Sequence, residues 1–200
     1  MDDELVKTTI KLTERVERLL TRQKLSAPTQ RILIALAGVP GSGKTTISDA
    51  LIKKLKKNSI PDVAVLPMDG FHYTRTTLSS FEDPDHAFRR RGAPFTFDAA
   101  ALLDFVVLLK KTPVTADDEP QIIIKAPGFD HARKDPIPDA IEISSHAKVV
   151  IIEGNYLLLD QEPWSRISTL VDDKSVSWSF VNFYSKLTCT RGGLSMYRST

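Results

Sequence analysis

The sequence of 200 residues predicts an α/β fold in which a mainly parallel sheet lies between two layers of helices. Strand-like apolar runs alternate along the chain with helix-like segments, which is the pattern of parallel strands joined by helices. Two of these runs, "ILIALA" and "VVII", are apolar at every position, as expected of strands buried on both faces. A glycine-rich turn joins the first of them to a helix.

Helical spacing of apolar residues predicts three helices. The first covers residues 3–23, and the second runs from Thr45 towards Asn58, where a cluster of lysines suits the carboxyl end of a helix. The third follows Asp98, which is expected to cap the segment "AAALLDFVVLLKK". Strands are predicted within residues 31–38, 62–72, 121–127 and 148–159, and the polar stretch 74–97 is expected to be rich in loops.

The glycine-rich turn "GVPGSGKTT" has the spacing of a phosphate-binding loop, and the strand before it and the helix after it are the context that this motif requires. Its backbone N–H groups would cradle phosphates, Lys44 would reach the β- and γ-phosphates, and the Thr45 hydroxyl would bind Mg²⁺. A glycine turn without function is the alternative, which the flanking elements disfavour. The fold expected is therefore a P-loop NTPase-like three-layer sandwich. The predicted nucleotide-binding residues are Gly38, Val39, Pro40, Gly41, Ser42, Gly43, Lys44, Thr45 and Thr46.

Two acidic residues stand at the carboxyl ends of predicted strands, where open α/β sheets bind their ligands. Asp69 could accept the proton of an attacking hydroxyl or hold magnesium, although a turn-forming aspartate before Gly70 is the plainer interpretation. Glu153 ends "VVIIE" and could lie beside the magnesium, or could be an acid that merely follows a core strand.

Five segments resemble the phosphoribulokinase/uridine kinase family, which includes pantothenate kinase and sugar kinases: "GVPGSGKTT", "MDGFH", "RRGAPFTFD", "PGFDHARKDP" and "IIEGNYLL", in that order within residues 30–172. The resemblance implies transfer of the γ-phosphate of ATP to a hydroxyl group of a small metabolite, with ATP and Mg²⁺ as cofactors. It implies that Asp69 is the general base, aided by Lys44, and that Glu153 lies near Mg²⁺. The residues that it places around the acceptor are His72, Tyr73, Arg91, Phe129, His131 and Arg133.

Several alternatives stay open at this point. His72 could be a loop histidine bonded to backbone, and the run Arg89–Arg91 could be a solvated basic loop, although a phosphorylated or anionic acceptor would use it. Nucleosides, sugars and pantothenate-like acids all remain candidate acceptors. An NTP hydrolase or nucleotide-gated switch and a non-catalytic nucleotide-binding module are the competing function classes.

The carboxyl end departs from the family pattern. Residues 1–174 are predicted to form one kinase-like domain, whereas residues 175–200 form an atypical, serine-rich tail without a helix of useful length. The resemblance implies an arginine-bearing lid helix here, so the lid is expected to be missing and the activity of this chain to be impaired. A retained intron, a frameshift or alternative splicing would each produce such a change.

Composition limits the partners. A net charge of +2 gives no reason to expect nucleic acid or an anionic membrane as a partner, and no apolar stretch reaches the roughly 20 residues of a membrane span. The single cysteine, Cys189, cannot form an internal disulfide. We expect a soluble cytoplasmic protein whose partners are ATP and a small-molecule acceptor, and a homodimer is compatible with these features.

Overall fold

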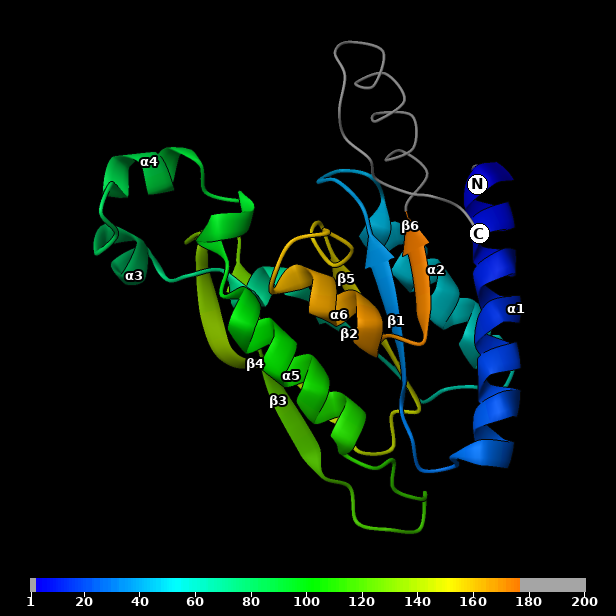
Figure 1. Cartoon of the computed structure of the whole chain (residues 1–200). Helices are drawn as coiled ribbons and strands as arrows, with labels where there is room; N and C mark the ends of the chain where they lie inside the picture. The colour runs from blue at the N-terminus through cyan, green and yellow to red at the C-terminus, as the bar shows by residue number, and fades with distance from the viewer. Residues whose placement is uncertain (1–2, 177–200) are drawn as a thin grey trace.

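The structure, a computed structural model, describes residues 3–176 and is built around a four-stranded parallel sheet (Figure 1). The strands are β1 (Ile32–Ala37), β2 (Val63–Pro67), β5 (Val149–Gly154) and β6 (Asp173–Val176), in the order β2-β5-β1-β6. All three pairings are parallel, which confirms the predicted mainly parallel sheet.

The central strand β1 is buried at all six positions because it has a strand on each side and helices over both faces. Its register with β5 sets Leu36 opposite Glu153 and Ala37 opposite Gly154. The two strands therefore end level with each other, and the segments that follow them leave the same edge of the sheet.

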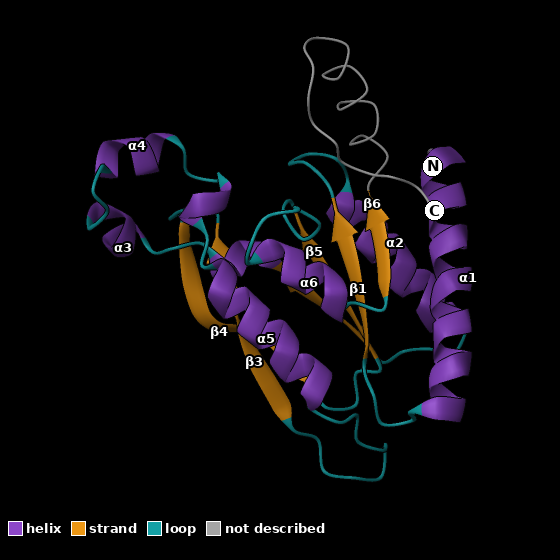
Figure 2. Cartoon of the chain, viewed as in Figure 1, coloured by secondary structure: helices purple, strands orange, loops and turns teal. Residues whose placement is uncertain are grey.

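Helices cover the two faces of the sheet in separate layers (Figures 1 and 2). The helices α1 (Asp3–Ser26) and α2 (Lys44–Lys57) pack on one face, whereas α5 (Ala99–Lys111) and α6 (Trp164–Leu170) pack on the other. Alternate residues of β1 divide between two apolar clusters. The first cluster joins Ile32, Ile34 and Leu36 to Leu12, Val16, Leu20, Ile47, Leu51 and Leu55, and the second joins Leu33 and Ala35 to Leu102, Leu103, Val106, Leu109, Trp164 and Ile167. The predicted three-layer sandwich is confirmed.

The strand predicted at residues 121–127 lies outside the parallel sheet. It forms β3 (Ile123–Asp130), which pairs antiparallel with β4 (Asp135–Ser144) in a separate two-stranded sheet. The second strand was not predicted, because "DPIPDAIEIS" contains two prolines and four acidic or polar side chains among few apolar residues. Most of its residues are exposed or half-buried, so no continuous apolar run marks it.

The strand predicted over residues 62–72 ends at Pro67 and continues as a 3-10 turn, η1 (Met68–Phe71). The reason is tertiary. Gly70 packs directly against the β3 backbone, since a Cβ added there would lie 2.0 Å from the Pro127 carbonyl oxygen. No other residue type fits this position, and the contact fixes the turn that carries Asp69.

The stretch predicted to be loop-rich holds three short helices: α3 (Arg75–Ser79), α4 (Pro84–Arg89) and η2 (Pro94–Thr96). The side chains of Thr74 and Asp83 cap the first two. The predicted Asp98 cap of α5 is confirmed, because the Asp98 carboxylate accepts a hydrogen bond from the Ala101 N–H.

Two further predictions concern the carboxyl-terminal tail and membrane-spanning helices. The boundary predicted after Lys174 falls within β6, and the prediction for the rest of the tail concerns residues 177–200, which lie outside the described residues. Over residues 3–176, no helix combines the length and apolar composition that a membrane span requires.

A buried arginine, Arg31, precedes β1 and bonds it to the end of α5 and to the turn before β5. Arg31 is 1% exposed, and its guanidinium donates to the carbonyl oxygens of Ala147 (2.8 Å), Leu109 (2.9 Å), Thr112 (3.2 Å) and Ser145 (3.3 Å). The carbonyls come from the carboxyl end of α5 and from the turn before β5. One side chain thus donates to four carbonyl groups, of which the Ser145 carbonyl also accepts from the Thr115 N–H at 3.2 Å.

We expect Arg31→Met to lower the free energy of unfolding by about 3 kcal/mol, because it leaves several buried carbonyl groups without a donor. Urea denaturation followed by circular dichroism measures the change. Arg18→Met is the matched control, since Arg18 is exposed on α1 and should change stability by less than about 0.5 kcal/mol. Equal stabilities of the two variants would show that the carbonyl contacts contribute nothing.

Candidate functional site

The predicted phosphate loop occupies the turn between β1 and α2. Gly41 and Gly43 have φ angles of 74° and 81°, in the left-handed region that glycine adopts most easily. Gly43 is the N-cap of α2, and no side chain caps the helix or adds an acidic group to its first turn. The amino end of the helix is therefore open to an anion, which its N–H groups and dipole would attract.

Lys44 is the first residue of α2, directly after the loop, and its ammonium group makes three hydrogen bonds. Its Nζ donates to the Gly38 carbonyl at 2.8 Å, the Val39 carbonyl at 3.0 Å and Asn155 Oδ1 at 3.0 Å. Burial lowers the pKa of the Lys44 ammonium, while the charges of Asp69 and Glu153 raise it. The charges of both predicted acidic residues therefore favour the protonated form of the ammonium group.

Asn155 is a contact residue that the sequence reasoning missed. It follows β5 directly and is half-buried. The available signal was its position in "EGNY", two residues after the predicted acid at the end of the strand. A polar side chain that close to a ligand-binding sheet edge is a candidate in its own right.

Glu153 connects the end of β5 to the head of α2. Its Oε1 accepts from the Thr45 hydroxyl at 3.3 Å, and its Oε2 accepts from the Ser48 hydroxyl at 2.9 Å. Ser48 was not predicted, although its position one helical turn after Lys44 places it on the same helix face. The structure therefore brings together the two residues that were expected to bind magnesium.

These oxygen groups fit Mg²⁺ better than a transition metal. Mg²⁺ prefers hard oxygen ligands and often binds one or two protein groups, with phosphates and water completing its shell. Glu153 and Thr45 offer a carboxylate and a hydroxyl beside the loop. Over residues 3–176 no group of three or more His, Cys, Asp or Glu side chains could hold a metal ion, so water and phosphate oxygens would complete the shell of an ion bound here.

Asp69 lies in η1, immediately after β2, and is half-buried. Because β2 pairs with β5 with Pro67 opposite Glu153, Asp69 comes to the same edge of the sheet as the loop. The negative charge of its carboxylate raises the pKa of Lys44 and that of His72, against the effect of burial. The predicted base therefore lies at the sheet edge of the phosphate loop, and its backbone carbonyl oxygen contacts His72, one of the residues expected around the acceptor.

His72 is the centre of an aromatic cluster on the acceptor side. Its ring lies 3.8 Å from the ring of Phe97 and 4.6 Å from that of Phe129, measured between centroids. The Nδ1 atom is 2.8 Å from the Asp69 carbonyl oxygen, so the network assigns the proton of the neutral ring to Nδ1 and leaves Nε2 as an acceptor.

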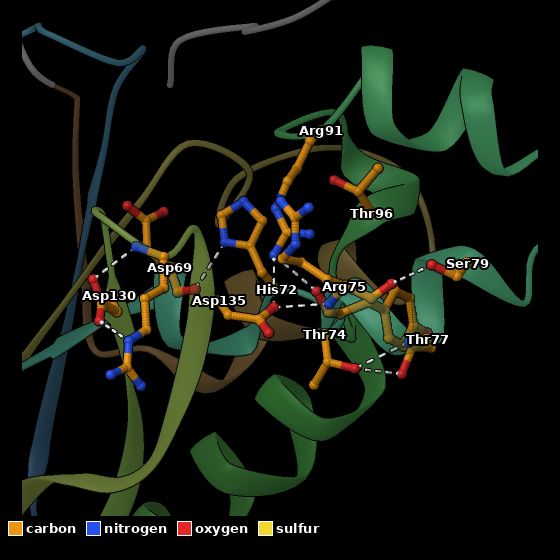
Figure 3. A network of polar contacts seen from close by, with 12 residues as sticks. Asp69, His72, Thr74, Arg75, Thr77, Ser79, Arg91, Thr96, Asp130 and Asp135 are labelled. Carbon is orange, nitrogen blue, oxygen red and sulfur yellow. Dashed lines mark hydrogen bonds and ion pairs between the residues drawn. The ribbon is translucent and has the colours of Figure 1, made fainter.

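Arg91 contacts the same cluster (Figure 3). Its Nη2 donates to the Tyr73 carbonyl oxygen at 3.0 Å and lies 3.4 Å from Asp135 Oδ1, while Cζ is 5.8 Å from the centre of the Phe129 ring. The Tyr73 ring packs edge-on against Phe81 at 5.6 Å, and burial raises the pKa of its hydroxyl. Of the predicted acceptor residues, Tyr73 therefore contributes its backbone to this cluster.

The two remaining predicted residues lie in and beside the turn of the β3–β4 hairpin. His131 is exposed and packs edge-on against Phe129 at 5.2 Å. The Arg133 side chain is 86% exposed and pairs with Asp130 Oδ2 at 3.6 Å. His131 therefore reaches the cluster through Phe129, whereas Arg133 bonds within its own turn.

Comparison with known proteins gives one family. A model described as the phosphoribulokinase/uridine kinase family matches residues 33–177. A candidate uridine kinase of Schizosaccharomyces pombe is 43% identical over 147 residues, which cover 73% of this chain and 60% of that protein. The ATP-dependent kinase YFH7 of Saccharomyces cerevisiae is 39% identical over 144 residues, covering 60% of this chain and 40% of YFH7. The chain thus spans less than two thirds of the length of these curated relatives.

Solved structures agree on the fold. The crystal structure of YFH7 from Saccharomyces cerevisiae, described as a candidate P-loop kinase with a circular permutation, superimposes with a TM-score of 0.69 at 26% identity, covering 81% of this chain and 78% of YFH7. A candidate fructose transport system kinase from Silicibacter sp. TM1040 gives a TM-score of 0.66 at 35% identity, covering 82% and 73% of the two chains.

We expect His72 to titrate below the ordinary histidine pKa of about 6.5. Burial lowers the pKa of its ring, and the charges of Arg91 and His131 act in the same direction, while the hydrogen bond and charge of Asp69 oppose them. Imidazole NMR signals recorded against pH, assigned by their loss in His72→Gln, measure the value. A value at or above 6.5 would contradict the prediction.

The lowered pKa of His72 also determines how its contribution to the free energy of unfolding changes with pH. Because the folded-state pKa of His72 is lowered, its contribution is present above about pH 6.5 and is lost as the pH falls towards the folded-state value. Wild-type protein should therefore lose more stability than His72→Gln on acidification through this range.

Proposed function

The chain belongs to the phosphoribulokinase/uridine kinase family, and on that basis we propose that it transfers the γ-phosphate of ATP to a hydroxyl group of a small metabolite. The observation that supports this best is the meeting of three groups at one edge of the sheet. Lys44 and Thr45 begin α2 after β1, Glu153 lies in β5, and Asp69 follows β2. These three strands are neighbours in the order β2-β5-β1.

Nucleotide binding would use the loop and the head of α2. The N–H groups of the first helical turn would bind phosphate oxygens, and Lys44 would exchange an oxygen partner for the β- and γ-phosphates. Thr45 and Glu153 would hold Mg²⁺, which on binding neutralises charge that builds on the phosphates. The relatives named as kinases support this use of the loop.

Asp69 would act on the acceptor. In the proposed step the acceptor hydroxyl oxygen bonds to the γ-phosphorus, its proton passes to Asp69, and the bridging P–O bond breaks so that ADP leaves. The position of Asp69 supports this role, because it follows β2 at the sheet edge that carries Glu153 and its backbone carbonyl oxygen lies 2.8 Å from His72 Nδ1. A nucleoside, a sugar or a pantothenate-like acid could serve as the acceptor.

An acceptor-dependent ADP-release assay tests the proposal. Release only after a metabolite is added is expected, whereas release without one indicates an NTP hydrolase, and no release by a protein that binds ATP indicates a nucleotide-binding module. We expect Asp69→Asn to lower turnover by about 100-fold or more while ATP affinity stays within about threefold, as for loss of a general base. Lys44→Met should abolish ATP binding instead.

The control for the base is Asp104→Asn, which removes an exposed carboxylate on α5 and should leave turnover unchanged. Parallel loss of ATP binding and turnover in Asp69→Asn would count against its role as the base. ATP affinity is measured with a fluorescent analogue, so it does not depend on knowing the acceptor.

We expect Glu153→Gln to raise the Mg²⁺ concentration needed for half-maximal ATP binding by roughly 10- to 100-fold, since the change removes a carboxylate from the metal's surroundings. Titration of Mg²⁺ against a fixed ATP analogue measures it. Glu142→Gln, on the exposed face of β4, is the matched control and should bind Mg²⁺–ATP as the wild type does. An unchanged Mg²⁺ requirement in Glu153→Gln would remove this residue from the proposed metal site.

A further inference from the structure

We propose that the acceptor of this site carries an anionic group, a carboxylate or a phosphate, which is bound by Arg91. The inference rests on the proposed function, because it names the class of molecule that would receive the phosphate. It is carried by the unsatisfied donors of Arg91 and by the position of Arg91 relative to Asp69.

The guanidinium of Arg91 is buried but incompletely bonded. The Arg91 side chain is 12% exposed. Its two polar contacts, with the Tyr73 carbonyl and with Asp135, are both made by Nη2. The atoms Nε and Nη1 are buried, and neither has a hydrogen-bond partner among the described residues. Buried donors are satisfied in nearly all native proteins, so a charged group with two unfilled donor atoms indicates that an acceptor is missing from the surroundings.

Neighbouring charges compensate Arg91 only in part. Asp135 on β4 approaches at 3.4 Å, which is long for a charge-assisted hydrogen bond, and the same Oδ1 atom accepts from the Arg75 N–H at 2.8 Å. The charge of Arg75 on α3 opposes that of Arg91. Burial lowers the pKa of Arg91 as well, since its charge has lost water without gaining a full counter-charge.

The unfilled donors belong to the acceptor side of the proposed site. From Arg91 the contacts run to the Phe129 ring at 5.8 Å, from Phe129 to the His72 ring at 4.6 Å, and from His72 Nδ1 to the Asp69 carbonyl oxygen at 2.8 Å. Figure 3 shows Asp69, His72 and Arg91 side by side in this order. A metabolite on this surface would present its hydroxyl to Asp69 and its anionic group to Arg91.

Hydrogen bonds hold the backbone around Arg91 in place, whereas the side-chain contact with Asp135 is long and therefore weak. The Arg91 N–H donates to the Phe88 carbonyl at 3.3 Å, and Tyr156 Oη donates to the Gly92 carbonyl at 2.6 Å. The contact with Asp135, at 3.4 Å, is longer than the 3.0 Å bond to the Tyr73 carbonyl, so an incoming anion would compete with the weaker of the two. An oxyanion is the partner whose charge and acceptor geometry match such a group.

The two preceding arginines do not share these features. Arg89 and Arg90 are both exposed, so water satisfies their charge. Arg90 is therefore a matched control for Arg91: it has the same side chain at the adjacent position and lies outside the buried cluster.

The test uses acceptor pairs that differ in the anionic group: glycerate with glycerol, pantothenate with pantothenol, and ribose 5-phosphate with ribose. Binding and ATP-dependent phosphorylation are measured for each. We expect an anionic member to be preferred, and the carboxylate and phosphate pairs show which anion is bound. Arg91→Gln should lower kcat/KM for that anionic acceptor by roughly 10- to 100-fold, as expected for lost charge-assisted hydrogen bonds. The same substitution should lower kcat/KM for the neutral member by much less.

Arg90→Gln should behave as the wild type, and Arg91→Lys, which keeps the charge, should retain part of the preference and serves if Arg91→Gln does not fold. Equal use of neutral and anionic acceptors, or an equal effect of Arg91→Gln on both, overturns the inference. So does failure of every anionic member to bind or react with a protein that binds ATP. A wild-type protein that binds no ATP overturns the proposed function itself.

Discussion

The parallel register between β1 and β5 is the constraint on which the rest of the candidate site depends. Pairing continues one residue past the strand, where the Gly38 N–H donates to the Gly154 carbonyl at 3.2 Å. The loop therefore begins at a fixed point beside Glu153. A shift of one residue would turn Glu153 to the other face of the sheet, away from Thr45 and Ser48. Backbone pairing between β1 and β5 therefore determines where the phosphate loop lies relative to Glu153.

The predictable part of the structure is the part encoded locally. The apolar runs of β1 and β5 and the glycines of the loop carry their own signals, so the central strands and the phosphate cradle follow from the sequence. Arg31 shows the limit. A charged residue before a strand is expected at the surface, and its burial depends on four carbonyl groups that come from segments more than 70 residues away.

The acceptor side depends on contacts between distant segments, which is why periodicity could not place it. Strand β4 has no continuous apolar run, and the position of the hairpin is set where Gly70 meets Pro127. His72, Phe129 and Arg91 come from three separate segments that are in contact in the folded structure. The motif resemblance grouped these residues, but it could not distinguish the buried Arg91 from Arg133, which bonds within its own turn.

The Lys44 ammonium already has three oxygen partners within the protein, as many as it has N–H donors. Two partners are carbonyls of the loop itself, and Asn155 is the one supplied by another segment. A triphosphate arriving at this lysine would displace an existing bond rather than meet a bare charge, so its binding energy is a difference between two satisfied states. The same three bonds also fix the direction in which the ammonium group points, because each of its N–H donors has a partner.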